Sequence, residues 1–270
     1  MQRTFNDDLM TDKVALISGG TRGINLGIAK RFVQLGAHVV VFGRNEQRAK
    51  EAEASLNEVG GGRAMGIACD VRDYDAVRDV VTRTRDAFGE LDVVIAGAAG
   101  NFFSPVVGLS ANAFKTVIDI DLLGTFHLFR ASYDALKTPG ASLIAITAAQ
   151  AEKATPFQAH AAAAKAGVNM LTKTLAIEWG PAGVRANLIA PGGIEGTEGV
   201  KFLASTPEQF DDAIQRIPAR RLGQVDEIAD MAVFFSSDAA AYVNGQVIYV
   251  DGGLKTGDGS YDCLTVPDRR

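Results

Sequence analysis

Short, continuously apolar segments alternate with helical segments along nearly the whole chain, and this alternation restricts the possible folds more than any other feature. Uniformly apolar segments of a few residues are typical of strands that are buried on both faces. They occupy residues 14–17, 39–42, 64–68, 93–96, 143–146, 184–190 and 247–250.

Helices are predicted between these strands. They cover residues 23–35, a segment that ends at glycines 60–62, and residues 73–88, 110–136, 157–179 and 225–236, with an irregular stretch before the last of them. Strands that alternate with helices need crossover connections, which are right-handed. The pattern predicts an α/β fold with a doubly wound parallel sheet (Rossmann fold) in a three-layer αβα arrangement.

The composition bounds the class of protein. The chain has 270 residues, near the upper limit for one hydrophobic core, and no Pro- or Ser-rich linker, so we expect a single domain over 1–270. A net charge of −5 provides no basic surface for nucleic acid. The three histidines and two cysteines lack metal-ligand spacing, so no metal is expected. No signal peptide, membrane-spanning run or C-terminal peroxisomal signal is found, so a cytoplasmic location without a membrane partner is expected.

A glycine-rich loop follows the first strand and opens a helix. Glycines let the backbone approach a pyrophosphate, and the N-terminus of the next helix offers N–H donors to it. The alternative is a tight turn without a ligand. We expect the loop to bind a dinucleotide through Gly19, Gly20, Thr21, Arg22, Gly23 and Ile24.

The end of the second strand favours NADP(H) over NAD(H). An NAD site would place Asp or Glu there for the ribose 2′-hydroxyl, but this chain has Arg44 and Asn45. Together with Arg22, Arg44 can bind a 2′-phosphate with charge-assisted hydrogen bonds. The alternative is that Arg44 is a solvated residue at the start of a helix.

The spacing of the loop glycines resembles that of the short-chain dehydrogenase/reductase family, although Asn25 replaces the third glycine. The segment from Asn244 to Gly253 also resembles the C-terminal signature of that family. The resemblance implies cofactor contacts at Asp70 and Val71 near the adenine, and at Pro191, Gly192, Ile194 and Thr197 near the nicotinamide. It further implies a substrate-covering segment at about 194–222 and a C-terminal tail at 254–270.

The chain departs from this family at the residues that deliver a proton to a ketone. Lys165 matches the lysine of the family's Tyr-x-x-x-Lys motif, but Ala161 occupies the tyrosine position. Ala148 replaces the usual serine, and Ala96 replaces an asparagine. Either catalysis has been lost, or the reaction needs no proton donor at a carbonyl oxygen.

Several other segments resemble the peroxisomal-type 2,4-dienoyl-CoA reductase branch of the family, among them 100–102, 110–126, 178–181 and 196–199. This branch implies an acyl-CoA thioester substrate, a 3-enoyl-CoA product, and hydride delivery to C5 with a proton on the α-carbon. Asp121 is the implied acid; the alternative is an ionised Asp121 that orients Lys165 and a water. The remaining implied residues are His160 as a donor to the thioester oxygen, and Arg72, Phe102, Ser110 and Asn112 as acyl-CoA contacts.

Three functions stay open at this point. The first is NADPH-dependent reduction of 2,4-dienoyl-CoA in unsaturated fatty acid β-oxidation. The second is a short-chain reductase for another conjugated or carbonyl substrate, and the third is a non-catalytic NADP-binding scaffold. His160 has its own alternative, a packed histidine without a catalytic role. A homotetramer is expected for two reasons. Helices 157–179 and 225–236 are apolar enough to be buried between subunits, and members of the family that this chain resembles are commonly tetramers.

Overall fold

The computed structural model describes residues 5–197, 199–200 and 206–260. Within them, seven parallel strands form one sheet in the order β3-β2-β1-β4-β5-β6-β7. The prediction of a doubly wound parallel α/β sheet is confirmed. The strands are β1 (Val14–Ser18), β2 (His38–Gly43), β3 (Ala64–Ala68), β4 (Val93–Ala96), β5 (Ser142–Ile146), β6 (Arg185–Pro191) and β7 (Val247–Val250).

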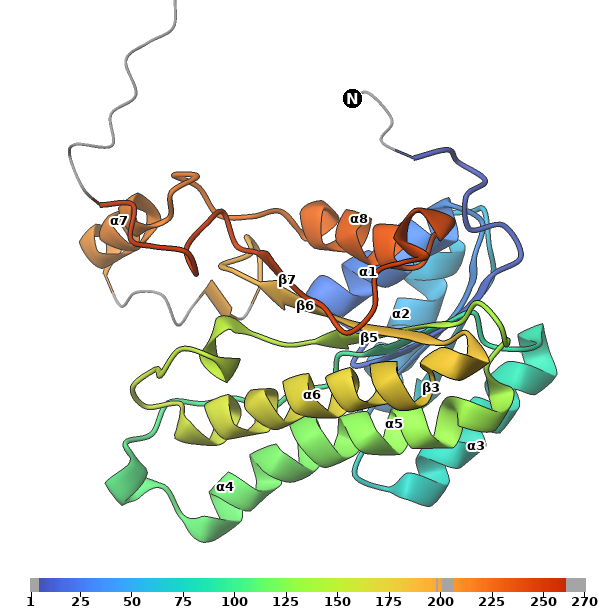
Figure 1. Cartoon of the computed structure of the whole chain (residues 1–270), viewed down its shortest axis with the longest axis horizontal. Helices are drawn as coiled ribbons and strands as arrows, with labels where there is room; N and C mark the ends of the chain where they lie inside the picture. Colours follow the sequence, from blue (N-terminus) through green and yellow to red (C-terminus); the bar gives the residue numbers. More distant parts are fainter. Residues whose placement is uncertain (1–4, 198, 201–205, 261–270) are drawn as a thin grey trace, which may run out of the picture.

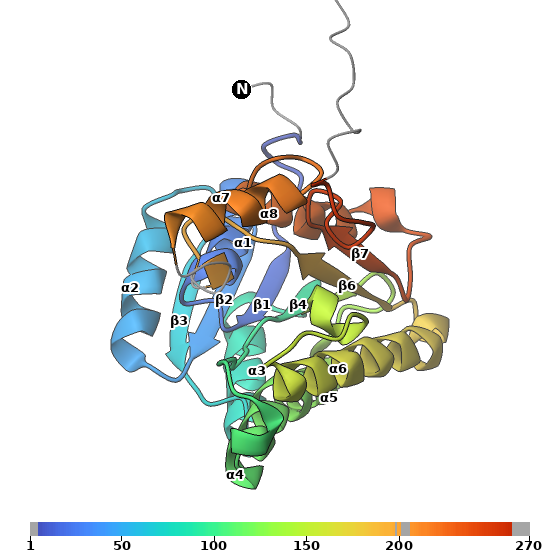
Figure 2. The same cartoon turned by 90° about the vertical axis from the view of Figure 1, so that its left-hand side faces the viewer.

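Helices cover both faces of the sheet (Figures 1 and 2). One layer contains α1 (Gly23–Gln34), α2 (Glu46–Asn57) and α8 (Val225–Phe235). The other contains α3 (Tyr74–Phe88), α4 (Ala111–Ile118), α5 (Gly124–Ser132) and α6 (Ala159–Glu178). Short 3₁₀ turns lie at Val106–Gly108, Tyr133–Ala135, Ala149–Ala151, Gly180–Ala182 and Asp238–Ala240.

Alternate residues of each strand fill two separate cores, because successive side chains of a strand point to opposite faces. In β1, Ala15 and Ile17 pack against the layer of α1 and α8. Val14 and Leu16 pack against the layer of α3, α5 and α6. Both faces of the sheet are therefore apolar, which explains why the strands are continuously apolar in sequence.

The order of the strands places a crevice beside β1. The chain runs outward from β1 to β2 and β3, then returns to β4 on the other side of β1. The loops after β1 and β4 therefore diverge at the carboxyl edge of the sheet, where doubly wound folds bind their ligands.

Two local features of the structure were not predicted from the sequence. The irregular stretch expected before α8 contains a helix, α7 (Pro207–Arg216), which Thr206 caps by accepting a hydrogen bond from Gln209 N. That prediction is wrong, because the apolar stripe of α7 is short: Phe210, Ala213 and Ile214 have helical spacing, but each is only half-buried. A π-helical turn, Asp119–Leu123, joins α4 to α5, and π turns of this kind often mark functional sites.

Candidate active site

A large cleft of about 1310 Å³ opens at the carboxyl edge of the sheet. Of the residues predicted to bind the cofactor or to act in catalysis, many line it: Gly19, Thr21, Arg22, Gly23, Ile24, Arg44, Asn45, Asp70, Val71, Lys165, Pro191, Gly192 and Thr197. The structure thus brings together the segments that follow four of the strands, β1, β2, β3 and β6. Lys165 comes from the middle of α6.

The glycine-rich loop has the geometry of a phosphate cradle. Gly19 and Gly23 have positive φ angles of 64° and 56°, which favour glycine. A Cβ atom on Gly23 would meet no other atom within 4 Å, so the space above it is open. Gly20 lies instead against β2, where a Cβ atom would be 2.7 Å from Val41. The loop therefore leaves room for a pyrophosphate above the first turn of α1, whose N–H groups lack intrahelical acceptors.

Asn25 joins the two loops of the crevice. Its side-chain Nδ2 donates to Gly97 O at 2.8 Å and to Gly19 O at 3.4 Å. A Cβ atom on Gly97 would lie 2.3 Å from that nitrogen, so the asparagine fits only because residue 97 is a glycine. Asn25 thus stands at the position of the family's third glycine, and its side chain links the loop after β1 to the loop after β4.

Three guanidinium groups line the cleft beyond the ends of β1 and β2: those of Arg22, Arg44 and Arg48. Within the described residues, none of the three side chains has a hydrogen-bonded or ion-paired partner. Asn45 caps α2 by accepting from Arg48 N at 2.8 Å. Arg48 was absent from the sequence prediction, although its place one turn into the helix after Arg44 was a usable signal.

Arg72 lies next to this part of the cleft but does not line it. Its guanidinium donates to both carboxylate oxygens of Asp70 at 2.6–3.1 Å. This hydrogen bonding holds the pKa of the Asp70 carboxyl below its ordinary value. Asp70 itself lines the cleft, so the pair keeps a carboxylate available to the ligand.

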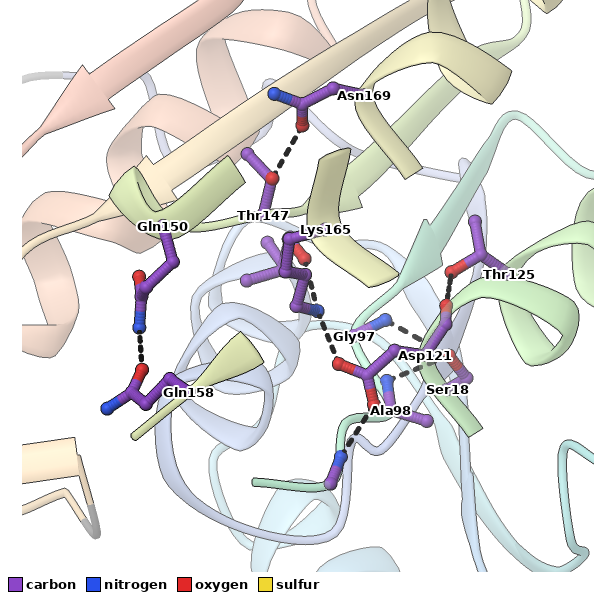
Figure 3. A network of polar contacts seen from close by, with 12 residues as sticks. Ser18, Gly97, Ala98, Asp121, Thr125, Thr147, Gln150, Gln158, Lys165 and Asn169 are labelled. Carbon is purple, nitrogen blue, oxygen red and sulfur yellow. Dashed lines mark hydrogen bonds and ion pairs between the residues drawn. The ribbon is translucent and has the colours of Figure 1, made fainter. Parts of the chain in front are cut away.

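Asp121 and Lys165 form a buried ion pair at the centre of the site (Figure 3). Asp121 is 1 % exposed, and its Oδ2 lies 3.2 Å from Lys165 Nζ. Its Oδ1 accepts from Gly100 N at 2.7 Å, while Lys165 Nζ also donates to Ile146 O at 3.0 Å. One carboxylate oxygen thus accepts a backbone N–H and the other faces the ammonium, an arrangement that suits an ionised Asp121.

The π turn and a glycine bring this pair together. Asp121 lies in the π turn, and its neighbour Leu122 packs on α6 at Gly167, where a Cβ atom would be 2.8 Å from Leu122 Cδ2. A larger residue at position 167 would displace the Leu122 side chain from this contact. Asp119 points elsewhere and pairs with Lys115 on the surface, as expected for a structural residue.

His160 is fully buried and does not line the cleft. Its ring stacks on Phe102 with centroids 4.2 Å apart, and neither ring nitrogen has a hydrogen-bond partner within the described residues. The stack connects α6 to the loop after β4, which also carries Asn101 and Phe103 on the cleft wall.

The other predicted contacts have local roles. Ser110 caps α4 by accepting from Ala113 N at 3.1 Å, and Asn112 lies exposed on the same helix. Ile194 is 2 % exposed and packs in the core, beside a β-bridge to Gly223. Of the covering segment 194–222, residues 198 and 201–205 lie outside the described residues, as do residues 261–270 of the tail.

The cleft is strongly cationic although the chain is acidic overall. Among the described lining residues, six are Lys or Arg and one is acidic: Arg22, Arg44, Arg48, Lys153, Lys165 and Lys255 against Asp70. Local positive charge attracts polyanionic ligands and raises their rate of association. The cleft is therefore built for a phosphorylated ligand.

Comparison with known proteins identifies the family. The family described as Enoyl-(Acyl carrier protein) reductase matches residues 19–255. The crystal structure of a short chain dehydrogenase from Bacillus anthracis superposes with a TM-score of 0.82 and 39 % identity, and covers 91 % of this chain and 97 % of that one. The chain belongs to the short-chain dehydrogenase/reductase family.

Two curated relatives have activities in their names. The peroxisomal 2,4-dienoyl-CoA reductase of Saccharomyces cerevisiae, named as (3E)-enoyl-CoA-producing, is 41 % identical over 254 residues, which are 93 % of this chain and 87 % of that protein. A Bacillus subtilis protein named "Probable 2,4-dienoyl-CoA reductase [(2E)-enoyl-CoA-producing]" is 40 % identical over 251 residues, which are 90 % of this chain and 97 % of that one.

Membership of the short-chain dehydrogenase/reductase family makes the protein an oxidoreductase that uses a nicotinamide dinucleotide. The open space above Gly23 and the unpartnered guanidinium groups fit such a cofactor. In the described part of the chain, no helix combines the length and the apolar character needed to cross a bilayer.

Proposed function

We propose that the protein is an NADPH-dependent 2,4-dienoyl-CoA reductase that forms a 3-enoyl-CoA during the breakdown of unsaturated fatty acids. One observation carries the proposal: the site keeps a buried Asp121–Lys165 pair but has alanines where a ketone reductase needs a serine and a tyrosine. Such a site lacks a phenol to protonate a carbonyl oxygen. It suits a substrate whose reduced carbon lies far from its carbonyl group.

The preference for NADPH is supported by the charge at the end of β2. Arg44 and Arg48 line the cleft there, as does Arg22 of the loop after β1, whereas the nearby Glu46 does not line it and pairs with Lys50. A 2′-phosphate binds well to such guanidinium groups, whereas a ribose 2′-hydroxyl finds no acceptor. We expect Arg44→Ala to raise the KM for NADPH about tenfold or more, the value of one lost charge-assisted hydrogen bond, and to leave the KM for NADH unchanged. An equal effect on both cofactors would contradict this assignment.

The chemistry separates the site of reduction from the site of protonation. When bound, NADPH supplies a hydride, which adds to C5 of the dienoyl thioester. The electron pairs of both double bonds then shift toward the thioester, and its oxygen gains the negative charge of a dienolate. A proton at the α-carbon completes a 3-enoyl-CoA, whereas a proton at C4 would give a 2-enoyl-CoA.

Asp121 and Lys165 are proposed to control this protonation. Asp121 holds the Lys165 ammonium in the cleft wall, where 12 % of the lysine side chain stays exposed. A water at the Lys165 ammonium can donate a proton to the α-carbon while it takes one from the ammonium, and the lysine regains its proton from solvent. Asp121 does not line the cleft, but it pairs with Lys165, which does. His160 does not line the cleft, and its ring nitrogens have no hydrogen-bond partner in the described part of the chain, so it receives no proton-transfer role in this proposal.

The acyl chain is proposed to lie against the apolar part of the cleft wall. Phe103, Pro156, Phe157 and Leu254 line this part, and Phe157 is 55 % exposed. The contacts implied for Phe102, Ser110, Asn112 and Arg72 remain predictions for the rest of the acyl-CoA. None of these four lines the cleft in the ligand-free chain.

A single assay tests the proposal. Purified protein with NADPH and 2,4-hexadienoyl-CoA should lose the absorbance of both compounds at equal molar rates, and NMR of the product should place the double bond at C3. Turnover of plain ketones instead would favour another short-chain reductase. Tight NADPH binding without turnover of any dienoyl-CoA would favour the scaffold.

We also propose that the protein is a homotetramer. The outer faces of α5 and α6 expose large apolar side chains: Phe126 is 44 % exposed, Met170 65 % and Ile177 78 %. Exposed apolar patches of this kind mark protein interfaces. The apolar residues of α8, by contrast, pack in the core of their own chain. Light scattering coupled to gel filtration measures the mass; a monomer at micromolar concentration would contradict the tetramer.

A further inference from the structure

Gln158 is the N-cap residue, directly before the first residue of α6, but its side chain does not cap the helix. Residues at this position commonly use a side-chain oxygen to accept a backbone N–H of the helix. The Gln158 side chain makes no such bond, although it is 5 % exposed and lines the cleft. A polar side chain that is buried, lines a ligand cleft and leaves its helix uncapped is available for a ligand.

Gln150 fixes the orientation of the Gln158 amide (Figure 3). The Gln150 Nε2 donates to Gln158 Oε1 at 2.6 Å, and Gln150 also lines the cleft. Because Oε1 is occupied, Gln158 offers only its Nε2 group, which carries two N–H donors. Within the described part of the chain, no acceptor is present for these donors.

The other donors on this wall are engaged elsewhere. Thr147, next to the position of the absent serine, donates to Asn169 Oδ1 at 2.5 Å, away from the cleft. The Lys165 ammonium is held by Ile146 O and Asp121. Ala148 has no donor in its side chain. The Gln158 amide is thus a neutral side-chain donor, held in a fixed orientation, that this part of the wall presents to a ligand.

The backbone before Gln158 is strained. Phe157 has a φ of 63°, in the left-handed region that a non-glycine residue adopts at a cost of about 1–3 kcal/mol. Its carbonyl oxygen accepts from Ser104 N at 3.0 Å, which ties this turn to the loop after β4. Strain of this size persists where the surrounding structure imposes it, and here it sets the direction in which Gln158 leaves the chain.

We propose that the Gln158 amide donates a hydrogen bond to the thioester carbonyl oxygen of the substrate, and that Gln150 is its positioning residue. The inference rests on the proposed function. The oxygen is neutral in the bound substrate, gains charge when hydride adds to C5, and returns to neutral when the α-carbon is protonated. A donor at this oxygen stabilises the charged state most, as in an oxyanion hole.

Kinetics of Gln158→Ala give the first test. Loss of one oxyanion donor lowers kcat about 10²-fold, and the dissociation constant for NADPH should not change. Gln150→Ala should lower kcat by less, about tenfold, because it removes a single neutral hydrogen bond that only orients the amide. Gln246→Ala is the matched control, since this glutamine precedes β7 at the opposite edge of the sheet and should leave kcat unchanged.

A pH profile of Gln158→Glu separates a catalytic role from a structural one. The glutamate keeps its acceptor for Gln150, but it donates to the substrate only when protonated. The ratio of its kcat to the wild-type kcat should therefore rise about tenfold or more between pH 7.5 and pH 5. A constant ratio across this range would overturn the proposal.

Infrared spectroscopy tests the contact directly and without turnover. The carbonyl stretch of a ¹³C-labelled 2,4-hexadienoyl-CoA bound with NADP⁺ should shift to lower frequency in the wild type and return toward its solution value in Gln158→Ala. An equal shift in both proteins would overturn the inference even if the wild type reduces the substrate. No reduction by the wild type would instead refute the proposed function, so the two failures can be told apart.

Discussion

The Asp121→Asn substitution replaces one carboxylate oxygen of the buried ion pair with an NH₂ group, and the geometry of the pair indicates how much stability and activity the protein should lose. An asparagine still accepts from Gly100 N, which lies 2.7 Å from Oδ1 in the wild type. Its Nδ2 replaces the oxygen that lies 3.2 Å from Lys165 Nζ, so two donors face each other. The ammonium then loses its counterion in a site where its side chain is 12 % exposed.

Removal of one partner of a buried ion pair destabilises a protein by about 3–5 kcal/mol. Lys165 keeps its hydrogen bond to Ile146 O and can take up a water from the cleft, so we expect the lower end of this range. Because the ammonium also loses its orientation, we expect kcat to fall about 10²-fold, the usual contribution of a placed acid or base. The affinity for NADPH should largely survive.

Urea unfolding followed by the fluorescence of Trp179, the single tryptophan, gives the free energy of unfolding. Steady-state kinetics at saturating NADPH gives kcat. Asp119→Asn is the matched control, because Asp119 pairs with the exposed Lys115 and such surface pairs contribute less than about 1 kcal/mol. The reasoning is refuted if Asp121→Asn unfolds at the same urea concentration as the wild type, or if its kcat is unchanged.

Three further predictions concern other parts of the molecule. Gly97→Ala should destabilise the fold by about 1–3 kcal/mol through its clash with Asn25, and Asn25→Gly in the same chain should recover most of that loss; additive effects in urea unfolding would contradict the contact. Hydrogen bonds from Arg221 lower the pKa of Glu227 to about 2 from an ordinary 4.5, so its stabilisation is complete above pH 4.5 and is lost as the pH falls toward 2. The Glu227 side chain is 39 % exposed, so Glu227→Gln should lower the free energy of unfolding by only about 1 kcal/mol at pH 6, and by nothing near pH 2. Thermal unfolding at both pH values measures this difference. Burial raises the pKa of the Cys69 thiol to about 11, so at pH 8 iodoacetamide should modify it slowly, and more slowly still with NADPH in the cleft; rapid modification in site-resolved mass spectrometry would disprove this.

Much of this protein follows from local patterns. Strands buried on both faces need continuous apolar runs, and helices between them need their own periodicity, so all seven strands and α1, α3, α6 and α8 were predicted within a few residues of their observed bounds in the described chain. One helical region was predicted over 110–136, where the structure has α4, a π turn and α5. The glycines of the loop after β1 and the arginine after β2 were also evident, because each depends on residues that are adjacent in sequence.

The chemistry of the site depends on contacts between distant segments. Asp121 meets Lys165 because a π turn rotates it and because Gly167 lets the two helices approach, and neither feature has a periodic signature. The same is true of His160, whose ring stacks on that of Phe102 from the loop after β4. Gln158 belongs to this group, since its direction depends on a strained neighbour and on a partner eight residues away.

The sequence by itself therefore determined the sheet, its layers and the edge at which a dinucleotide binds, because hydrophobic periodicity and glycine conformation act over a few residues. Only the tertiary structure decided which polar groups face one another across that edge. The rotation of each helix and the close approach of its neighbours set those distances, and they result from the packing of the whole chain.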